Sequence, residues 1–236
     1  MSIAVFVVMA LLWFVPVWLL QGSAKKNNLL RVVIALIAGA GPCVFLTMLG
    51  QGGVTRVLRG MELDTGAYLF WDSFIGAALI EEGLKFLTAW LCMRGMKSPR
   101  RIDCILIYGA VGLGFNLFET LLGIEDVLTA VYSGLFPLHL MFQMWMGCFC
   151  YDLFYGHGNK LKWALLAFAV PFITHGLNDY LVFTGLKALG LMGGTAEETV
   201  PATVFALVPF YVYLIVFEIV TMKRAVRAAK EVRPAA

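Results

Sequence analysis

Long apolar runs alternate with short polar segments along almost the whole chain. The polar separators are rich in glycine, asparagine and charged residues, which is typical of loops. A helix needs about 20 apolar residues to cross a hydrocarbon core roughly 30 Å thick. The pattern therefore predicts an all-α fold, a polytopic membrane helical bundle of about seven transmembrane helices. The apolar runs fall at residues 2–20, 29–49, 66–93, 102–124, 130–155, 161–186 and 201–222.

The composition agrees with this pattern. Hydrophobic residues make up 61% of the 236 residues, charged residues only 14%, and the mean hydropathy is +0.84. Soluble domains average about 25% charged residues, so the chain belongs with membrane proteins. Lys25 and Lys26 follow the first apolar run and no basic residue precedes it, which favours a spanning helix over a cleaved signal peptide. We expect one transmembrane domain, 1–236, with its functional core at about 66–186.

Basic residues are distributed unevenly between the two sides of this seven-helix arrangement. One side collects fourteen Lys and Arg residues, whereas the other has only Arg56, Arg59 and Lys187. Because cytoplasmic loops are enriched in Lys and Arg, the N-terminus is predicted outside and the C-terminus inside. No basic stripe suits nucleic acid, so we expect no such partner. The fourteen are Lys25, Lys26, Arg31, Arg94, Lys97, Arg100, Arg101, Lys160, Lys162, Lys223, Arg224, Arg227, Lys230 and Arg233.

The cysteines show no pattern of a metal site or a disulfide framework. All five lie in or at the ends of apolar segments, and no CxxC is present. We interpret them as thiols that pack within the bundle. They are Cys43, Cys92, Cys104, Cys148 and Cys150.

Ionisable residues interrupt four of the apolar runs. A charged group at the centre of a bilayer costs several kcal/mol, so each must face the bundle interior, a partner or water. At about 1.5 Å of rise per residue, the groups from all four helices fall in one layer, in the middle to outer half of the membrane. These residues are Glu81, Glu82 and Lys85 in the third run, Glu119 in the fourth, His139 in the fifth, and His175 and Asp179 in the sixth.

The spacing of polar and small residues also indicates inward faces. Residues three or four apart share one face of a helix. Stripes that mix small and polar side chains suit close contacts between membrane helices. The three stripes are Gly112, Asn116 and Glu119; His139, Gln143 and Gly147; and Pro171, His175 and Asp179.

Charged neighbours on the third and sixth helices suggest specific pairs. Lys85 lies four residues after Glu81 and three after Glu82, so it could neutralise one carboxylate and leave the other as a general acid or base. Asp179 lies one helical turn after His175 and could orient its ring. A buried ion pair that only fixes helix register would also explain the charges on the third helix.

Four motifs, in order and each on its own predicted helix, resemble the PrsW family. That family is similar to the type II CAAX prenyl proteases and the bacterial Abi proteins. The likeness covers about residues 75–180, and one departure is Thr120, where the family often has Asn. The motifs are Glu81-Glu82-Gly-Leu-Lys85, Phe115-Asn-Leu-Phe-Glu119, His139 followed eight positions later by Gly147, and His175-Gly-Leu-Asn-Asp179.

The resemblance implies an intramembrane endopeptidase that cuts a membrane-anchored protein. The expected substrate is a single-pass anti-sigma factor, cleaved on its extracytoplasmic side. Glu81 or Glu82 would activate water, as a general base does. The other groups, His139, His175, Glu119 and Asp179, would hold the water, stabilise the oxyanion or orient the imidazoles. The supporting residues would be Lys85, Asn116, Gln143 and Asn178.

Two further questions stay open from the sequence. His139 and His175 with a carboxylate could bind zinc, but no HExxH is present, and the metal-free glutamic version is favoured. His139 could instead be a hydrogen-bonded packing residue. A proton- or ion-coupled transporter would also place such groups at mid-membrane, but it would usually show inverted repeats or broken helices, and none is detected. A member of the family that binds substrate without cutting it is the remaining alternative.

Overall fold

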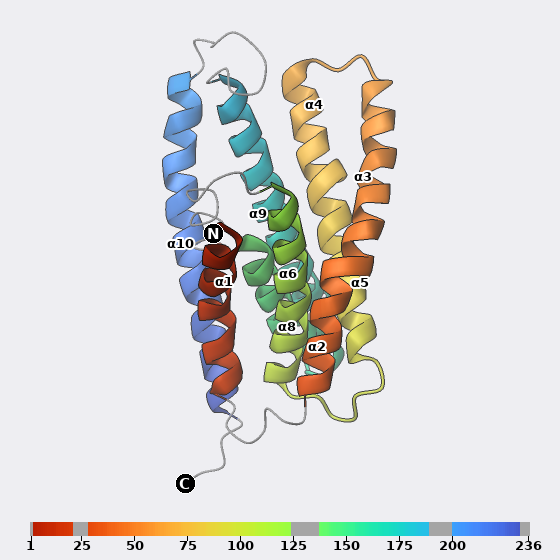
Figure 1. Cartoon of the computed structure of the whole chain (residues 1–236), viewed down its shortest axis with the longest axis vertical. Helices are drawn as coiled ribbons and strands as arrows, with labels where there is room; N and C mark the ends of the chain where they lie inside the picture. The colour runs from red at the N-terminus through yellow and green to blue at the C-terminus, as the bar shows by residue number, and fades with distance from the viewer. Residues whose placement is uncertain (1, 21–27, 124–136, 189–199, 232–236) are drawn as a thin grey trace.

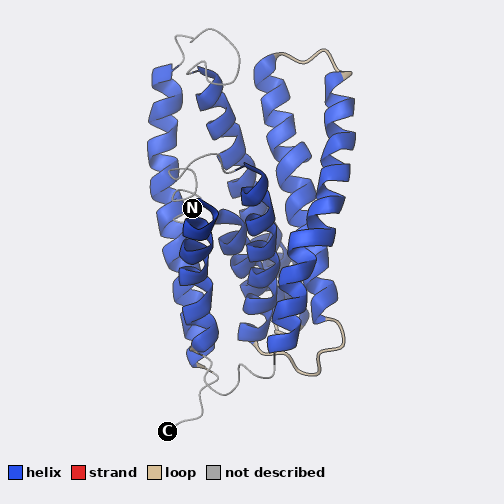
Figure 2. Ribbon diagram, in the orientation of Figure 1, coloured by secondary structure: helices blue, strands red, loops and turns tan. Residues whose placement is uncertain are grey.

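The computed structural model describes residues 2–20, 28–123, 137–188 and 200–231. Within these ranges the chain is helical with no strand (Figure 2). The described helical segments make up seven passes, and these run alternately up and down the long axis of the molecule (Figure 1). The predicted all-α bundle is confirmed.

The second and third passes are each built from three joined helical segments, and the others are single helices. The segments are α1 (Ser2–Leu19); α2 (Leu29–Ala38), η2 (Gly39–Cys43) and α3 (Val44–Arg59); α4 (Thr65–Trp71), η3 (Asp72–Leu79) and α5 (Ile80–Met93); α6 (Arg101–Gly123); α8 (Leu138–Phe154); α9 (Lys160–Ala188); and α10 (Val200–Lys230).

Two passes extend beyond the predicted runs. The second pass continues to Arg59 rather than ending near residue 49, and α10 continues to Lys230 rather than ending near residue 222. Part of the fifth run, 130–136, lies outside the described residues. Among the described helices, three are long and apolar enough to cross a membrane by length and composition: Leu29–Arg59, Arg101–Leu121 and Lys160–Gly185.

The segments η2 and η3 are π-helical and were not predicted. Pro42 lies inside η2, where its missing N–H removes one hydrogen bond from the helix. The other segment, η3, ends directly before the turn that bears Glu81 and Glu82. Wide turns of this kind occur frequently at functional sites.

Helix α6 lies at the centre of the bundle (Figure 1), and its residues from Ile102 to Asn116 are almost all buried. Glycines let α8 approach it closely. A Cβ on Gly112 would lie 2.2 Å from the backbone oxygen of His139, and one on Gly147 would lie 2.6 Å from the backbone oxygen of Cys104. The close contact brings the polar stripes of α6 and α8 together. The five cysteines are free thiols, four of them buried, as predicted.

Candidate active site

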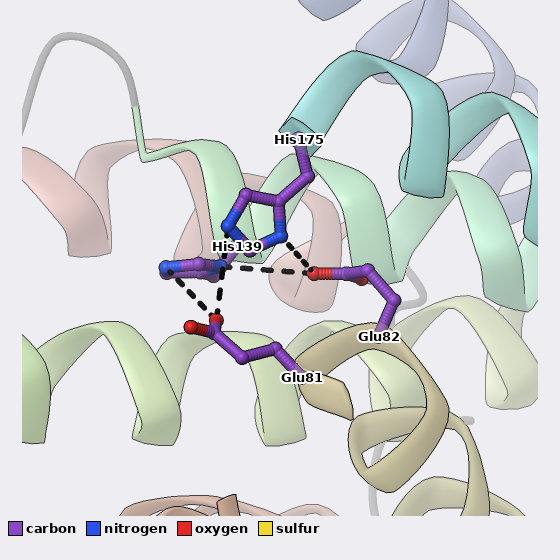
Figure 3. A group of neighbouring side chains, drawn as sticks. All are labelled: Glu81, Glu82, His139 and His175. Atoms are coloured by element: carbon purple, nitrogen blue, oxygen red, sulfur yellow. Dashed lines mark hydrogen bonds and ion pairs between the residues drawn. The ribbon is translucent and has the colours of Figure 1, made fainter. Parts of the chain in front are cut away.

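Four ionisable side chains from three helices converge inside the bundle (Figure 3). Glu81 and Glu82 come from α5, His139 from α8 and His175 from α9. Each offers one nitrogen or oxygen atom, and these four atoms lie within 4.8 Å of one another. All four side chains are buried among the described residues. The predicted convergence of mid-membrane charges is therefore present in the structure.

Lys85 lies at the centre of this cluster and is fully buried. Its Nζ lies 3.0 Å from Glu81 Oε2, 2.8 Å from Glu82 Oε1 and 2.7 Å from His139 Nδ1. The expected ion pairing of Lys85 is present, and its single ammonium group contacts both carboxylates from the same turn of helix. The ring of Phe115 covers the ammonium at 4.1 Å.

These contacts define the hydrogen-bonding roles of His139. An ammonium group can only donate, so His139 Nδ1 accepts from Lys85. The hydrogen of the neutral ring is then on Nε2, which lies 2.7 Å from Glu119 Oε2 and donates to it. This assignment links Glu119 on α6 to the glutamates on α5 through a single imidazole. His139 is thus an integral member of the polar network rather than an isolated packing residue.

His175 bridges Glu82 and the predicted partner Asp179. Its Nδ1 lies 2.9 Å from Glu82 Oε1, and its Nε2 lies 3.3 Å from Asp179 Oδ2. The pairing of His175 with Asp179 one turn later is confirmed. Phe142 stacks on the ring with centroids 5.6 Å apart, which restrains the orientation of the imidazole from its face.

Two glutamine side chains hold the remaining carboxylate oxygens. Gln143 on α8 donates to Glu82 Oε2 at 2.8 Å, and Gln51 on α3 donates to Glu81 Oε1 at 2.9 Å. Gln143 was named from its stripe with His139. Gln51 was missed because the Gly-rich stretch around it was interpreted as a loop, whereas the helix runs on to Arg59. A helical interpretation of that stretch would have placed Gln51 on the second predicted helix.

The two glutamates differ in their surroundings. Glu82 is fully buried, and it contacts Lys85 and His175 through one oxygen and Gln143 through the other. Glu81 retains 4% exposure. Its Oε2 lies 3.8 Å from His175 Nε2 and 3.9 Å from His139 Nε2. Those separations exceed direct hydrogen bonds, but they suit a small bridging group such as a water molecule.

A cavity of about 210 Å³ adjoins the two histidines. Glu119 lines it, and 54% of this side chain is exposed, so the cavity reaches the surface beside α6. Asn116 and Asn178 line the cavity without contacting the glutamates: Asn116 donates to Thr120 at 3.5 Å and Asn178 to Asp179 at 3.2 Å. The imidazoles therefore separate the cavity from the glutamates on α5.

The comparisons with known proteins agree with this constellation. The family model described as "PrsW family intramembrane metalloprotease" matches residues 28–217, which include every residue of the site. The chain belongs to the PrsW family. It is accordingly a membrane protein of a family of intramembrane proteases, and the expected resemblance is confirmed. No solved structure shows significant similarity to the chain.

Curated PrsW proteases from three bacteria are similar to this chain. Protease PrsW of Clostridioides difficile (strain 630) is 29% identical over 168 residues, 66% of this chain and 69% of that protein. Protease PrsW of Oceanobacillus iheyensis (strain DSM 14371 / CIP 107618 / JCM 11309 / KCTC 3954 / HTE831) is 27% identical over 165 residues, 66% and 68% of the two chains. The match to Protease PrsW of Geobacillus kaustophilus (strain HTA426), 27% identical over 116 residues, covers 47% of this chain and 52% of that protein.

The donor set of this PrsW site is one that can bind a divalent metal ion. Two imidazoles and two carboxylates supply the nitrogen and oxygen ligands that zinc uses. Four carboxylates lie in or beside the cluster, whereas Lys85 is the only amine that contacts it among the described residues. The Lys85 ammonium lies among the same ligand atoms and would compete with a metal for them. The carboxylates are Glu81, Glu82, Glu119 and Asp179.

Two other acidic groups of the described helices remain apart from the site. Asp72 on η3 accepts a hydrogen bond from Thr55 at 3.4 Å. Glu218 on α10 is 4% exposed, and its Oε1 makes no hydrogen bond within the described residues. Neither carboxylate forms a hydrogen bond or ion pair with the described groups of the site.

Proposed function

We propose that this chain is an intramembrane endopeptidase that hydrolyses a peptide bond in a membrane-anchored protein. The observation that supports this most strongly is the juxtaposition of two buried glutamates with two histidines from separate helices beside a cavity. A water molecule between carboxylate and imidazole is the usual arrangement for general base catalysis on a carbonyl group. The proposal extends to a single catalytic domain spanning residues 1–236, with its core at 66–186.

Glu81 is the better placed of the two candidate bases. Its Oε2 faces the Nε2 atoms of both histidines and its side chain retains 4% exposure, whereas Glu82 is fully buried and contacts His175 directly. In this proposal Glu81 takes a proton from the attacking water. Glu82 fixes the positions of Lys85 and His175.

The remaining groups act on the substrate carbonyl or on the imidazoles. The rings of His139 and His175 face the cavity in which the scissile peptide bond would lie. An N–H group aimed at the developing oxyanion stabilises it, and His139 Nε2–H is such a donor once Glu119 turns away. Asp179 orients the ring of His175 from its cavity side.

A metal-dependent version uses the same residues. Glu81, His139 and His175, together with Glu82, would hold the ion, which would supply Lewis acidity and an activated water. The metal-free version remains our preference because Lys85 already supplies a cation to both glutamates. Zinc bound at this site would have to displace that ammonium group. Metal content and sensitivity of the active protein to chelators distinguish the two versions.

We further propose a substrate and a topology. Seven spans with the N-terminus outside would put the clustered Lys and Arg residues in the cytoplasm. The cluster of glutamates and histidines would then lie in the middle to outer half of the bilayer. A single-pass anti-sigma factor cut on its extracytoplasmic side fits this position. The substrate assignment follows from the family resemblance.

The test is cleavage of a single-pass membrane substrate by the purified protein in proteoliposomes. Wild-type protein is expected to release a soluble fragment, and His175→Ala and Glu81→Gln are each expected to slow its release strongly. Ion-gradient-driven uptake that depends on the same residues would instead establish a transporter. Binding of the substrate without cleavage by a folded wild-type protein would establish a non-catalytic family member.

A further inference from the structure

A second group of charged residues surrounds the last turns of α10, at the end of the bundle where α6 begins (Figure 1). Two cavities, of about 600 Å³ and 800 Å³, lie against this part of α10. They share Lys223, Arg227 and Glu231 as lining residues. The final turns of α10 therefore contribute to both cavities.

The smaller cavity contains basic groups with no acidic partner. Arg101 is paired with Asp152 through contacts of 2.6 and 2.8 Å. By contrast, among the residues that the structure describes, no carboxylate lies within ion-pair distance of Lys223 or Arg224. The Arg224 guanidinium is held 5.0 Å from the centre of the Phe149 ring. Such an oriented but unneutralised guanidinium is suited to bind a phosphate group.

The larger cavity is mostly apolar and lies between α1 and α10. Trp13 of α1 faces Ile219, Met222 and Val226 of α10 across it. Lys230 and Glu231 lie at its polar end. A cavity that is apolar along most of its length and basic at the end matches an acyl chain joined to an anionic headgroup.

We propose that these two cavities together bind one anionic phospholipid. Lys223 and Arg224 contact the phosphate of the headgroup, and an acyl chain lies along Trp13 and Val226. Charge complementarity supports this occupant, since basic pockets between membrane helices bind anionic headgroups at the bilayer surface. Neither cavity is lined by Glu81, His139 or His175. The lipid site is therefore separate from the catalytic cluster, and its test does not depend on peptidase activity.

Native mass spectrometry of the purified full chain tests this site. The probes are phosphatidylglycerol, phosphatidylcholine with the same acyl chains, and inorganic phosphate. The variants are Lys223→Gln combined with Arg224→Gln, and Arg224→Gln alone should the double variant fail to fold. The matched control is Arg94→Gln combined with Lys97→Gln, which removes the same charge from two residues between α5 and α6 that line neither cavity.

Wild-type protein is expected to retain one phosphatidylglycerol in preference to phosphatidylcholine. Each basic residue near an anionic lipid contributes about 1 kcal/mol, so the double variant should bind about 30-fold more weakly, while the control stays like wild type. Equal retention of both lipids, or equal loss in the control, would overturn the proposal. Displacement of the lipid by inorganic phosphate at similar concentration would identify a free-phosphate site instead. A dimer that dissociates in the double variant would identify a second copy of the chain as the occupant.

Discussion

At the scale of single residues, Lys85 determines how the site is organised. One ammonium group contacts both glutamates and His139, and it is completely buried. Ion pairs between Glu81, Glu82 and Lys85 within one helix could by themselves have a purely structural role. The same carboxylates also lie close to His139 on α8 and His175 on α9. The charged groups of α5 therefore belong to a network that joins three helices.

The two glutamates should respond differently to neutralisation. We expect Glu81→Gln to lower the rate of cleavage by about 10²- to 10⁴-fold, the usual contribution of a general base, with little change in stability. We expect Glu82→Gln to lower thermal stability as well, because it removes a charge from a fully buried network with Lys85 and His175. Cleavage rates and thermal unfolding in detergent measure both effects. Equal stability losses in the two variants would contradict the assigned roles.

Gln51 is a positioning residue for the proposed base. It donates to Glu81 Oε1 from α3, and its loss should loosen that carboxylate without removing its charge. We expect Gln51→Ala to lower kcat about tenfold, the order of one lost hydrogen bond to a charged group, and to leave KM unchanged. Gln51→Glu would place a second charge beside Glu81 and should be more damaging. A change in KM alone would indicate that Gln51 contacts substrate instead.

The sequence was informative about individual residues only where they lay within predicted helices. Mid-membrane charge and helical spacing were sufficient to single out Glu119, His139 and His175, because each is costly in a bilayer. The same reasoning failed for Gln51, an uncharged residue in a stretch that resembles a loop. It also could not show that Lys85 contacts both carboxylates, since that depends on rotamers rather than on spacing.

At the scale of helices, close packing of α6 against α8 aligns the site. Gly112 allows the backbone of α8 to approach α6 near His139, and Gly147 does the same about two turns further along α8. The stripes of small and polar residues predicted this contact. The π-helical segments η2 and η3 were not predictable, because they arise from how whole passes fit together and have no periodic sequence signal.

Filling the contact at Gly112 should disturb both stability and catalysis. A methyl group there would meet the backbone oxygen of His139 at 2.2 Å and Gln143 Cβ at 2.8 Å. We expect Gly112→Ala to destabilise the protein by about 1–3 kcal/mol, the usual cost of overpacking. Gly53→Ala on α3 is the matched control, because nothing lies within 4 Å of a Cβ at that position. Thermal unfolding that ranks the two variants in the opposite order would contradict this packing.

At the scale of the whole molecule, the seven apolar runs correspond to seven antiparallel helical passes (Figure 1). The number of passes and their alternation could be predicted because a polar segment separates each apolar run of the sequence from the next. The precise ends of the helices could not be predicted from the runs, because the last turns of the second pass and of α10 are polar and amphipathic. Length and composition single out three of the described helices as able to span a membrane, so the topology needs a direct measurement.

The proposed topology places the N-terminus outside and the C-terminus in the cytoplasm. A C-terminal green fluorescent protein fusion should be fluorescent in a bacterial host, and a C-terminal alkaline phosphatase fusion should be inactive. Fusions at residue 62, in the segment between α3 and α4, should show the reverse pattern. The proposed topology requires an odd number of membrane crossings between residue 62 and the C-terminus. The same reporter signal at both positions would contradict it.

The central claim is that Glu81 directs a water molecule onto a peptide bond within the membrane. The most direct measurement is cleavage of a single-pass substrate by the purified protein in ¹⁸O-labelled water, with mass spectrometry of the new C-terminus. The account predicts one ¹⁸O atom in the new carboxyl group from wild-type protein, and release of the fragment from folded Glu81→Gln that is slower by about 10²-fold or more. Undiminished fragment release by Glu81→Gln, or a product without the label, would contradict it.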